Sequence, residues 1–190
     1  MNDASMRDYK DALIEALASF VCCKDPDVQT FLNSKAIQFE KRGWASTYLL
    51  LNEEAMNNNK LVVDGYFSLT HKAVRFDDSV TKSKRSYITG DRKSSDHSFV
   101  LIGQLGKRIV DLGDEKYEKA DLTAADILSD ALTIIEQSSK YIICRNIILE
   151  CKPIEKIKNI YIQNGFIELQ YDEKHNLFTM YNRIEHSLDF

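Results

Sequence analysis

Residues 159–166 read NIYIQNGF, and this stretch joins the end of a helix to the start of a strand. Isoleucines recur every three residues up to this point, which is the spacing of one helix face. Gly165 then breaks the pattern, because glycine readily takes the left-handed backbone conformation that closes a helix. The apolar residues from Phe166 onward predict a strand. We therefore expect a helix over 154–164 that leads directly into a strand, with Tyr161 in the last helical turn.

Hydrophobic spacing predicts the remaining elements on both sides of this stretch. Apolar residues three or four apart indicate helices, and runs of β-branched, aromatic and aliphatic residues indicate strands. Helices are expected at 9–20, 27–39 and 121–139. Strands are expected at 44–51, 61–69, 70–76, 99–110, 146–150, 166–171 and 176–181. Helices and strands mixed in this order indicate an α/β fold.

The chain has 190 residues and a hydrophobic content of 44%, which is enough for one sizeable core, so we expect a single domain over 1–190. Its segment 77–98 is rich in Ser, Lys, Asp and Arg and almost free of apolar residues, which predicts a long, flexible, solvated loop. Basic side chains in this loop could touch an anionic partner, such as RNA or a cofactor phosphate, but a solvated loop is the favoured explanation. They are Lys82, Lys84, Arg85, Arg92 and Lys93.

Composition and motif spacing exclude several functional classes. A formal charge of -4 argues against a surface that binds nucleic acid throughout, although a local basic patch is compatible with it. The apolar run 12–23 is too short to span a bilayer and contains Glu15, so we expect a cytoplasmic protein without a membrane anchor. No metal site is expected, because the four cysteines and four histidines lack ligand spacing; the histidines are His71, His97, His175 and His186.

The element order, with an interrupted strand, a helix, a strand and a helix ending in Gly-Phe, resembles that of the GNAT family of N-acetyltransferases. The fourth helix of that family commonly ends in a pattern like fYeklGF, which 160–166 matches at the aromatic residue, the glycine and the phenylalanine. The N-terminal half resembles the toxin-like branch of the family. The matching stretches are SFVCCKDPDVQTFLNSKA at 19–36, STYLLL at 46–51 and VVDGYFSLTHKAV at 62–74.

This resemblance implies a single-domain GNAT fold, in which helices flank a mixed central sheet with splayed parallel strands. It also implies acetyl-CoA as cosubstrate and direct acetyl transfer to a primary amine. Tyr161 would then be the general acid that protonates the departing CoA thiolate. The alternative is a core tyrosine whose hydroxyl finds a structural partner. Glu150 and Asp64 are candidates for the base, but either could equally be an edge charge or a solvated group.

The resemblance also implies cofactor contacts at the end of the strand 99–110. Its stretch IGQLGK, at 102–107, lies where family members offer backbone hydrogen bonds to the pantetheine arm. A glycine there would remove a clash with the cofactor, and the alternative is a bulge glycine that only shapes the sheet. The contacts expected from this stretch are Gln104, Leu105, Gly106 and Lys107.

A second set of contacts is implied at the start of the helix 121–139, where the family pattern Q/R-x-x-G-x-G/A cradles the pyrophosphate. Here 119–124 reads KADLTA, so the first glycine is missing. Backbone N–H groups and the helix dipole remain available, although Asp121 is unfavourable beside phosphate unless it caps the helix. The expected contacts are Lys119, Leu122, Thr123, Ala124 and Ala125.

Three functions stay open at this point. The first is acetylation of a small or protein amine. The second, from the toxin-like resemblance, is acetylation of the α-amine of an aminoacyl-tRNA, against which the acidic charge balance argues. The third is a non-catalytic acyl-CoA-binding module, suggested by the altered phosphate loop. The oligomeric state is equally open, with a homodimer as one alternative.

Overall fold

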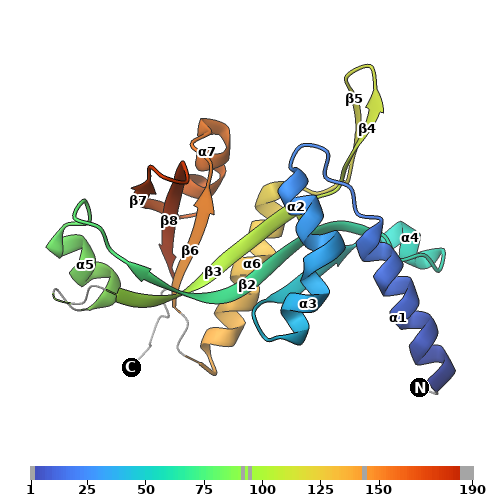
Figure 1. Cartoon of the computed structure of the whole chain (residues 1–190), viewed down its shortest axis with the longest axis horizontal. Coiled ribbons are helices and arrows are strands. Elements are labelled where there is room, and N and C mark those ends of the chain that lie inside the picture. The colour runs from blue at the N-terminus through green and yellow to red at the C-terminus, as the bar shows by residue number, and fades with distance from the viewer. Residues whose placement is uncertain (1–2, 91–92, 94–95, 143–144, 185–190) are drawn as a thin grey trace. The chain divides into compact units, whose positions relative to one another are not determined.

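The computed structural model describes residues 3–90, 93, 96–142 and 145–184, with side chains from residue 9 onward (Figure 1). The chain divides into two compact units, which we treat separately. Unit 1 comprises Met1–Ser68 and Gln104–Leu128, and unit 2 comprises Leu69–Gly103 and Ser129–Phe190.

Helical segments come first in the chain, and strands and helices are mixed after them. The N-terminal part holds α1 (Asp3–Ala18), α2 (Pro26–Thr30), a π-helical segment (Phe31–Lys35), α3 (Ala36–Lys41), β1 (Ser46–Leu51), α4 (Glu53–Asn57) and β2 (Val63–Arg75). The middle holds α5 (Lys82–Thr89), β3 (Asp96–Lys107), β4 (Ile109–Gly113), β5 (Lys116–Lys119) and α6 (Ala124–Ser139). The chain continues with β6 (Asn146–Cys151), α7 (Glu155–Gln163), β7 (Ile167–Asp172) and β8 (Leu177–Arg183).

The main sheet has the hydrogen-bonded order β1-β2-β3-β6-β8-β7. Strands β3 and β6 are parallel, with Val100 opposite Ile147 and Ile102 opposite Leu149. Strand β8 is antiparallel to both β6 and β7, so the sheet is mixed. The predicted α/β fold with a mixed sheet and a parallel pair is therefore confirmed. The two strands expected at 61–69 and 70–76 are one continuous strand, β2.

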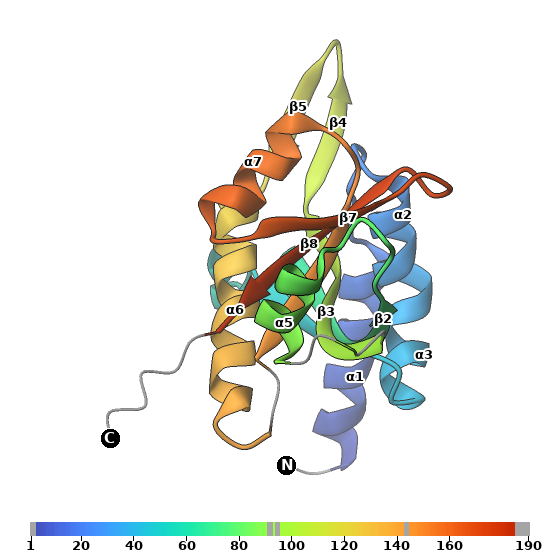
Figure 2. The same cartoon turned by 90° about the vertical axis from the view of Figure 1, so that its left-hand side faces the viewer.

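A short hairpin between β3 and α6 was not predicted. Strands β4 and β5 form a separate two-stranded sheet, which stands off from the other elements of unit 1 in Figures 1 and 2. Its turn consists of Asp114 and Glu115, whose φ angles are 51° and 60°. Two consecutive positive φ values are typical of a type I′ turn, which normally carries Asn-Gly, so this sequence gave only a weak turn signal.

The segment 77–98 was predicted to be a loop, but its centre forms helix α5, so the prediction is wrong there. Thr81 caps the helix by accepting from the Lys84 N–H, and Gly90 ends it with φ 77°. The apolar residues of the segment are few, but Val80 and Ile88 are both buried in the core of unit 2. These two buried side chains and the Thr81 cap help to order a segment that looks solvated by composition. Arg92, from the predicted basic cluster, lies outside the described residues.

Two members of the predicted basic cluster serve the packing of unit 2. Arg85 donates through Nη2 to the Asp77 carbonyl and through Nε to the Val80 carbonyl, at 2.7 and 2.9 Å. Lys84 donates to the carbonyls of Glu168 and Leu169. Both side chains therefore donate hydrogen bonds to backbone carbonyls of their own unit.

The core of unit 1 is built around Tyr66, whose relative exposure is 0%. Its ring meets Phe20 edge-on at 5.5 Å and stacks on Phe31 at 6.2 Å, measured between ring centroids. The hydroxyl donates to the Val28 carbonyl at 2.6 Å, so the one polar atom of the side chain is satisfied. Burial raises the pKa of Tyr66 well above its usual range.

The backbone of β3 approaches Tyr66 at Gly106. A Cβ added to Gly106 would lie 2.4 Å from Cε1 of Tyr66 and 2.5 Å from Cγ1 of Val28. Side chains at such distances overlap, so this position excludes every residue with a Cβ unless its neighbours move. Close packing on Tyr66 and Val28 is therefore a structural reason for this glycine, distinct from the bulge considered above.

We predict that Gly106→Ala lowers the free energy of unfolding by about 1 to 3 kcal/mol, because Tyr66 and Val28 must move to admit the methyl group. Urea denaturation measures this loss. The double variant Gly106→Ala/Val28→Ala should lose less than the sum of the two single changes, since the shorter side chain relieves part of the overlap. A Gly106→Ala protein as stable as the wild type would contradict the packing account.

Candidate active site

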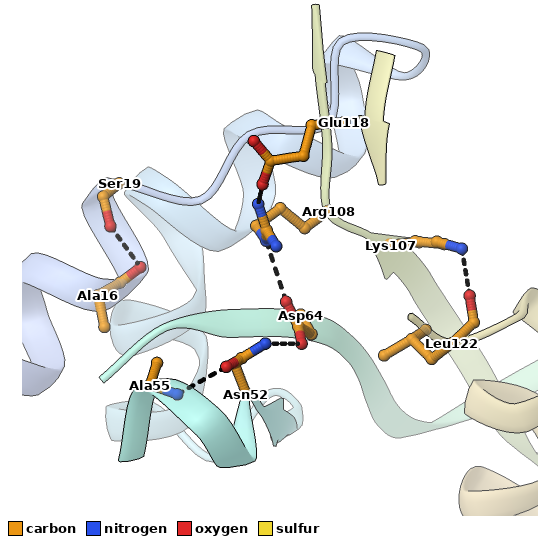
Figure 3. A network of polar contacts seen from close by, with 9 residues as sticks. All are labelled: Ala16, Ser19, Asn52, Ala55, Asp64, Lys107, Arg108, Glu118 and Leu122. Atoms are coloured by element: carbon orange, nitrogen blue, oxygen red, sulfur yellow. Dashed lines mark hydrogen bonds and ion pairs between the residues drawn. The ribbon is translucent and has the colours of Figure 1, made fainter. Parts of the chain in front are cut away.

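The two predicted cofactor-binding stretches come together in unit 1. Gln104, Leu105 and Lys107 are half-buried at the end of β3. The Lys107 ammonium donates to the Leu122 carbonyl in the segment that precedes α6 (Figure 3). This contact joins the end of the strand to the start of the helix, as the predicted site requires. Lys119 differs from the others, because it ends β5 and pairs with Ile109 in the hairpin.

Helix α6 begins with a reciprocal cap. The Thr123 N–H donates to Oδ2 of Asp126 at 2.6 Å, and the Asp126 N–H donates to Oγ1 of Thr123 at 3.1 Å. This is a capping box with aspartate in place of the usual glutamate, so Thr123 is the cap and Asp121 is not. The Thr123 N–H, followed by its hydroxyl, lowers the pKa of the Asp126 carboxyl below its usual range.

The cap leaves two backbone donors at the helix start unused. The N–H groups of Ala124 and Ala125 have no acceptor among the residues that the structure describes. They belong to a helix of 16 residues, whose dipole places partial positive charge at this end. Free donors and a dipole suit an anionic group, whereas the Asp126 carboxylate in the same turn opposes one.

Tyr161 lies in the last turn of α7 in unit 2, as predicted. Its carbonyl accepts from the Asn164 and Phe166 N–H groups at 3.0 and 3.1 Å, and Gly165 has a φ of 83°. Its ring meets the ring of Phe166 edge-on at a centroid distance of 6.1 Å. Within the described part of the chain, the Tyr161 hydroxyl has no hydrogen-bond partner, unlike that of Tyr66.

The surroundings of Tyr161 keep its phenol protonated. Burial, followed by the Cys151 side chain, raises the pKa of Tyr161 to about 12. Desolvation has this effect because it disfavours the charged phenolate. The proton is therefore present throughout the neutral range, and no described neighbour holds it.

Asp64, one candidate base, is committed to a buried polar network in unit 1 (Figure 3). Its Oδ1 accepts from Nε of Arg108 at 3.0 Å, and its Oδ2 accepts from the Asn52 side chain at 2.7 Å. Arg108 also contacts Glu118 through Nη1 at 2.6 Å. The side-chain exposures are 10% for Asp64, 19% for Arg108 and 54% for Glu118. Both oxygens of Asp64 are thus engaged in structure.

Glu150, the other candidate base, is also engaged by a partner. Its Oε1 accepts from Nζ of Lys72 at 2.6 Å in unit 2. The pair is about one-third exposed, with side-chain values of 39% for Lys72 and 35% for Glu150, so it forms an ordinary partly solvated ion pair. Sequence reasoning had no means of finding these partners, because both pairs join residues far apart in the chain.

Metal binding and membrane spanning find no support in the described residues. His, Cys, Asp and Glu side chains do not gather there in the groups of three that a metal ion would need. His186 lies outside that part of the chain. The helices of the described part are too short or too polar to span a membrane.

We predict that Asp64→Asn and Glu118→Gln differ sharply in stability although both act on Arg108. Asp64→Asn leaves a mostly buried guanidinium short of charge compensation, at a cost of roughly 3 kcal/mol. Glu118→Gln changes an exposed partner and should cost less than about 1 kcal/mol. Chemical denaturation compares the two. Equal losses would contradict the network, and a stable Asp64→Asn protein with lost turnover would restore Asp64 as a base.

Comparisons with known proteins identify the fold. No family model matches the sequence, and no curated protein matches it either. A solved structure described as a bacterial toxin is similar at a TM-score of 0.65 and 15% identity, covering 89% of this chain and 83% of its own. A KacT mutant gives 0.63 and 19%, with 89% of each chain covered. AtaT complexed with acetyl-methionyl-tRNAfMet gives 0.61 and 21%, covering 86% and 85%. The chain therefore has the fold of these toxins over most of its length.

Proposed function

We propose that this protein is an acetyl-CoA-dependent N-acetyltransferase whose acceptor is the α-amine of an aminoacyl-tRNA. The observation that carries the proposal is the fold shared with AtaT, which has been solved with acetyl-CoA and with acetyl-methionyl-tRNAfMet. Because aminoacyl-tRNA is used in the cytoplasm, the proposal places the reaction there. Acetylation of a small or protein amine is the alternative that the experiment below separates.

On this proposal, unit 1 holds the cofactor. The backbone of Gln104, Leu105 and Gly106 would hydrogen-bond the pantetheine arm, and the free N–H groups of Ala124 and Ala125 would meet the pyrophosphate. These backbone donors do not depend on the missing glycine. Lys107 adds positive charge beside the helix start, where its ammonium already donates to the Leu122 carbonyl. Leu122 and Thr123 would border the same site, and Lys119 would contribute only through its charge.

We predict that acetyl-CoA stabilises the protein and that Asp126→Asn increases its affinity. At a hundredfold excess over Kd, binding adds about 2.7 kcal/mol, a Tm rise of roughly 5 to 10 °C. Removing the Asp126 charge should tighten binding by roughly 3- to 10-fold, because that carboxylate repels the pyrophosphate. Thermal shift and calorimetry measure both effects. Asp130→Asn is the matched control, since Asp130 is exposed one turn further along α6. No shift and no heat at saturating acetyl-CoA would contradict the proposal.

Tyr161 would supply the proton in the transfer step. As the acceptor amine attacks the acetyl carbonyl, the bond to sulfur breaks and the departing thiolate needs a proton. The Tyr161 phenol is protonated at neutral pH and has no described hydrogen-bond partner to give up. These two properties support the general-acid assignment.

We predict that Tyr161→Phe lowers turnover by roughly 100-fold or more, with little change in cofactor affinity. Stability should fall by less than about 1 kcal/mol, because no described hydrogen bond is lost. A raised pKa means that the protonated form persists to higher pH, so wild-type turnover should show no loss from this group near pH 10, where an ordinary tyrosine ionises. Tyr141→Phe, at a solvent-exposed tyrosine of unit 2, is the control. Wild-type turnover in folded Tyr161→Phe protein would rule the role out.

The acceptor is tested by incubating the protein with radiolabelled acetyl-CoA and, in parallel, charged tRNA, uncharged tRNA, a panel of small amines and a peptide. Label that appears only in charged tRNA, and that is released with the amino acid on mild base treatment, supports the α-amine as acceptor. Label in the amines or the peptide instead favours the alternative. If the protein binds the cofactor but label appears in none of the tested substrates, the remaining function is that of an acyl-CoA-binding module.

A further inference from the structure

Unit 2 contains a cavity of about 530 Å³ that the proposed chemistry does not use. It is lined by parts of β2, α5 and β3 and by the beginning of β6 and the end of β8. Four side chains around it are hydrogen-bond donors suited to an anion: His71, His97, Arg145 and Arg183. None of the described residues that line the cavity is acidic.

Arg145 is the most informative of the four. The residue is half-buried, and its guanidinium has neither an ion-pair nor a hydrogen-bond partner within the described ranges. Arg183, in contrast, donates through Nη1 to the Tyr87 carbonyl at 3.3 Å, at the end of α5. Two arginines that line one cavity without a carboxylate among its described lining residues repel each other, and a bound anion would relieve this repulsion.

His97 is held in one orientation by a partly buried chain of hydrogen bonds. The Tyr181 hydroxyl donates to Oδ1 of Asn146 at 3.0 Å, so the Asn146 amide nitrogen faces Nε2 of His97 at 3.1 Å. Since the amide nitrogen can only donate, Nε2 accepts and the neutral ring carries its hydrogen on Nδ1. Tyr181 is 2% exposed and therefore anchors the chain firmly. The result is a fixed imidazole with an N–H left for an acceptor.

An aromatic ring completes the cavity. Tyr87 lines it and is 57% exposed, although most large apolar side chains of unit 2 are covered. An exposed aromatic ring beside arginines is the combination that binds nucleotides, because the base stacks on the ring while the guanidinium groups hold the phosphate.

We propose that this cavity binds a nucleotide through its phosphate, with Arg145, Arg183 and His97 as donors to the phosphate oxygens and Tyr87 as the stacking surface for the base. The ligand is either a free nucleotide or a nucleotide within an RNA strand, since both present the same chemistry. The inference does not rest on the acetyltransferase proposal, whose cofactor contacts lie in unit 1.

Calorimetry on the full chain tests the site with AMP, adenosine, inorganic phosphate and a short single-stranded RNA, each in the presence of saturating CoA. AMP should bind more tightly than adenosine. Arg145→Gln should raise the Kd for AMP by roughly 10- to 100-fold, because a charge-assisted contact is lost. Arg75→Gln, at an exposed arginine paired with Asp96, removes the same charge elsewhere in unit 2 and should have no such effect.

A second variant keeps the test independent of folding defects. Tyr87→Leu should weaken AMP binding but leave the affinity for inorganic phosphate unchanged, since only stacking is lost. RNA that binds more tightly than AMP identifies a strand as the ligand, and the reverse order identifies a free nucleotide. Absence of binding by every phosphate-bearing probe, or wild-type AMP affinity in Arg145→Gln, would overturn the proposal. Acetyl transfer itself is measured separately by the labelling experiment, so loss of AMP binding in Arg145→Gln with normal labelling would separate the two proposals.

Discussion

The close approach of β3 to Tyr66 is the constraint on which unit 1 depends. Tyr66 is fully buried among Phe20 and Phe31, and its hydroxyl is satisfied by the Val28 carbonyl. The strand can pass beside this ring only because Gly106 has no side chain. Helix α2, the aromatic core and the end of β3 are therefore fixed by one another. The same strand end carries the backbone that the proposed cofactor site needs, so packing and binding share one set of atoms.

The candidate polar groups differ in the interactions that each of them already makes. Asp64 has both oxygens engaged, Glu150 is paired with Lys72, and Lys107 donates to a backbone carbonyl. Tyr161 differs from all three, because burial raises its pKa while its hydroxyl has no described partner. A protonated phenol that no described neighbour engages can donate its hydrogen bond to a bound ligand. That availability supports the chemical role proposed for Tyr161.

Much of the fold followed from local signals in the sequence. The stretch 159–166 predicted helix α7, its closure at Gly165 and the strand beyond, because helix spacing and glycine conformation are properties of neighbouring residues. Helix α5 was missed because its order comes from burying Val80 and Ile88, which composition cannot weigh. Asp121 was considered only as a possible cap of α6, and the Thr123–Asp126 spacing of a capping box, which was visible in the sequence, was overlooked. The charged partners of Asp64 and Glu150, Arg108 and Lys72, lie 44 and 78 residues away, beyond any local pattern.

The β4–β5 hairpin has a base fixed by backbone hydrogen bonds. The Ile109 N–H donates to the Val21 carbonyl, the Cys23 N–H donates to the Ile109 carbonyl, and the Ala120 N–H donates to the Arg108 carbonyl. Side chains alternate between faces along each strand, so removing one residue would turn every later side chain of that strand to the opposite face. The hairpin already contains one exception, because its register shifts between Asp111 and Gly113, where β4 carries one residue without a partner in β5. The hairpin can therefore change length by a matched pair of residues or by a single residue placed in a bulge, while the hydrogen bonds at its base stay the same.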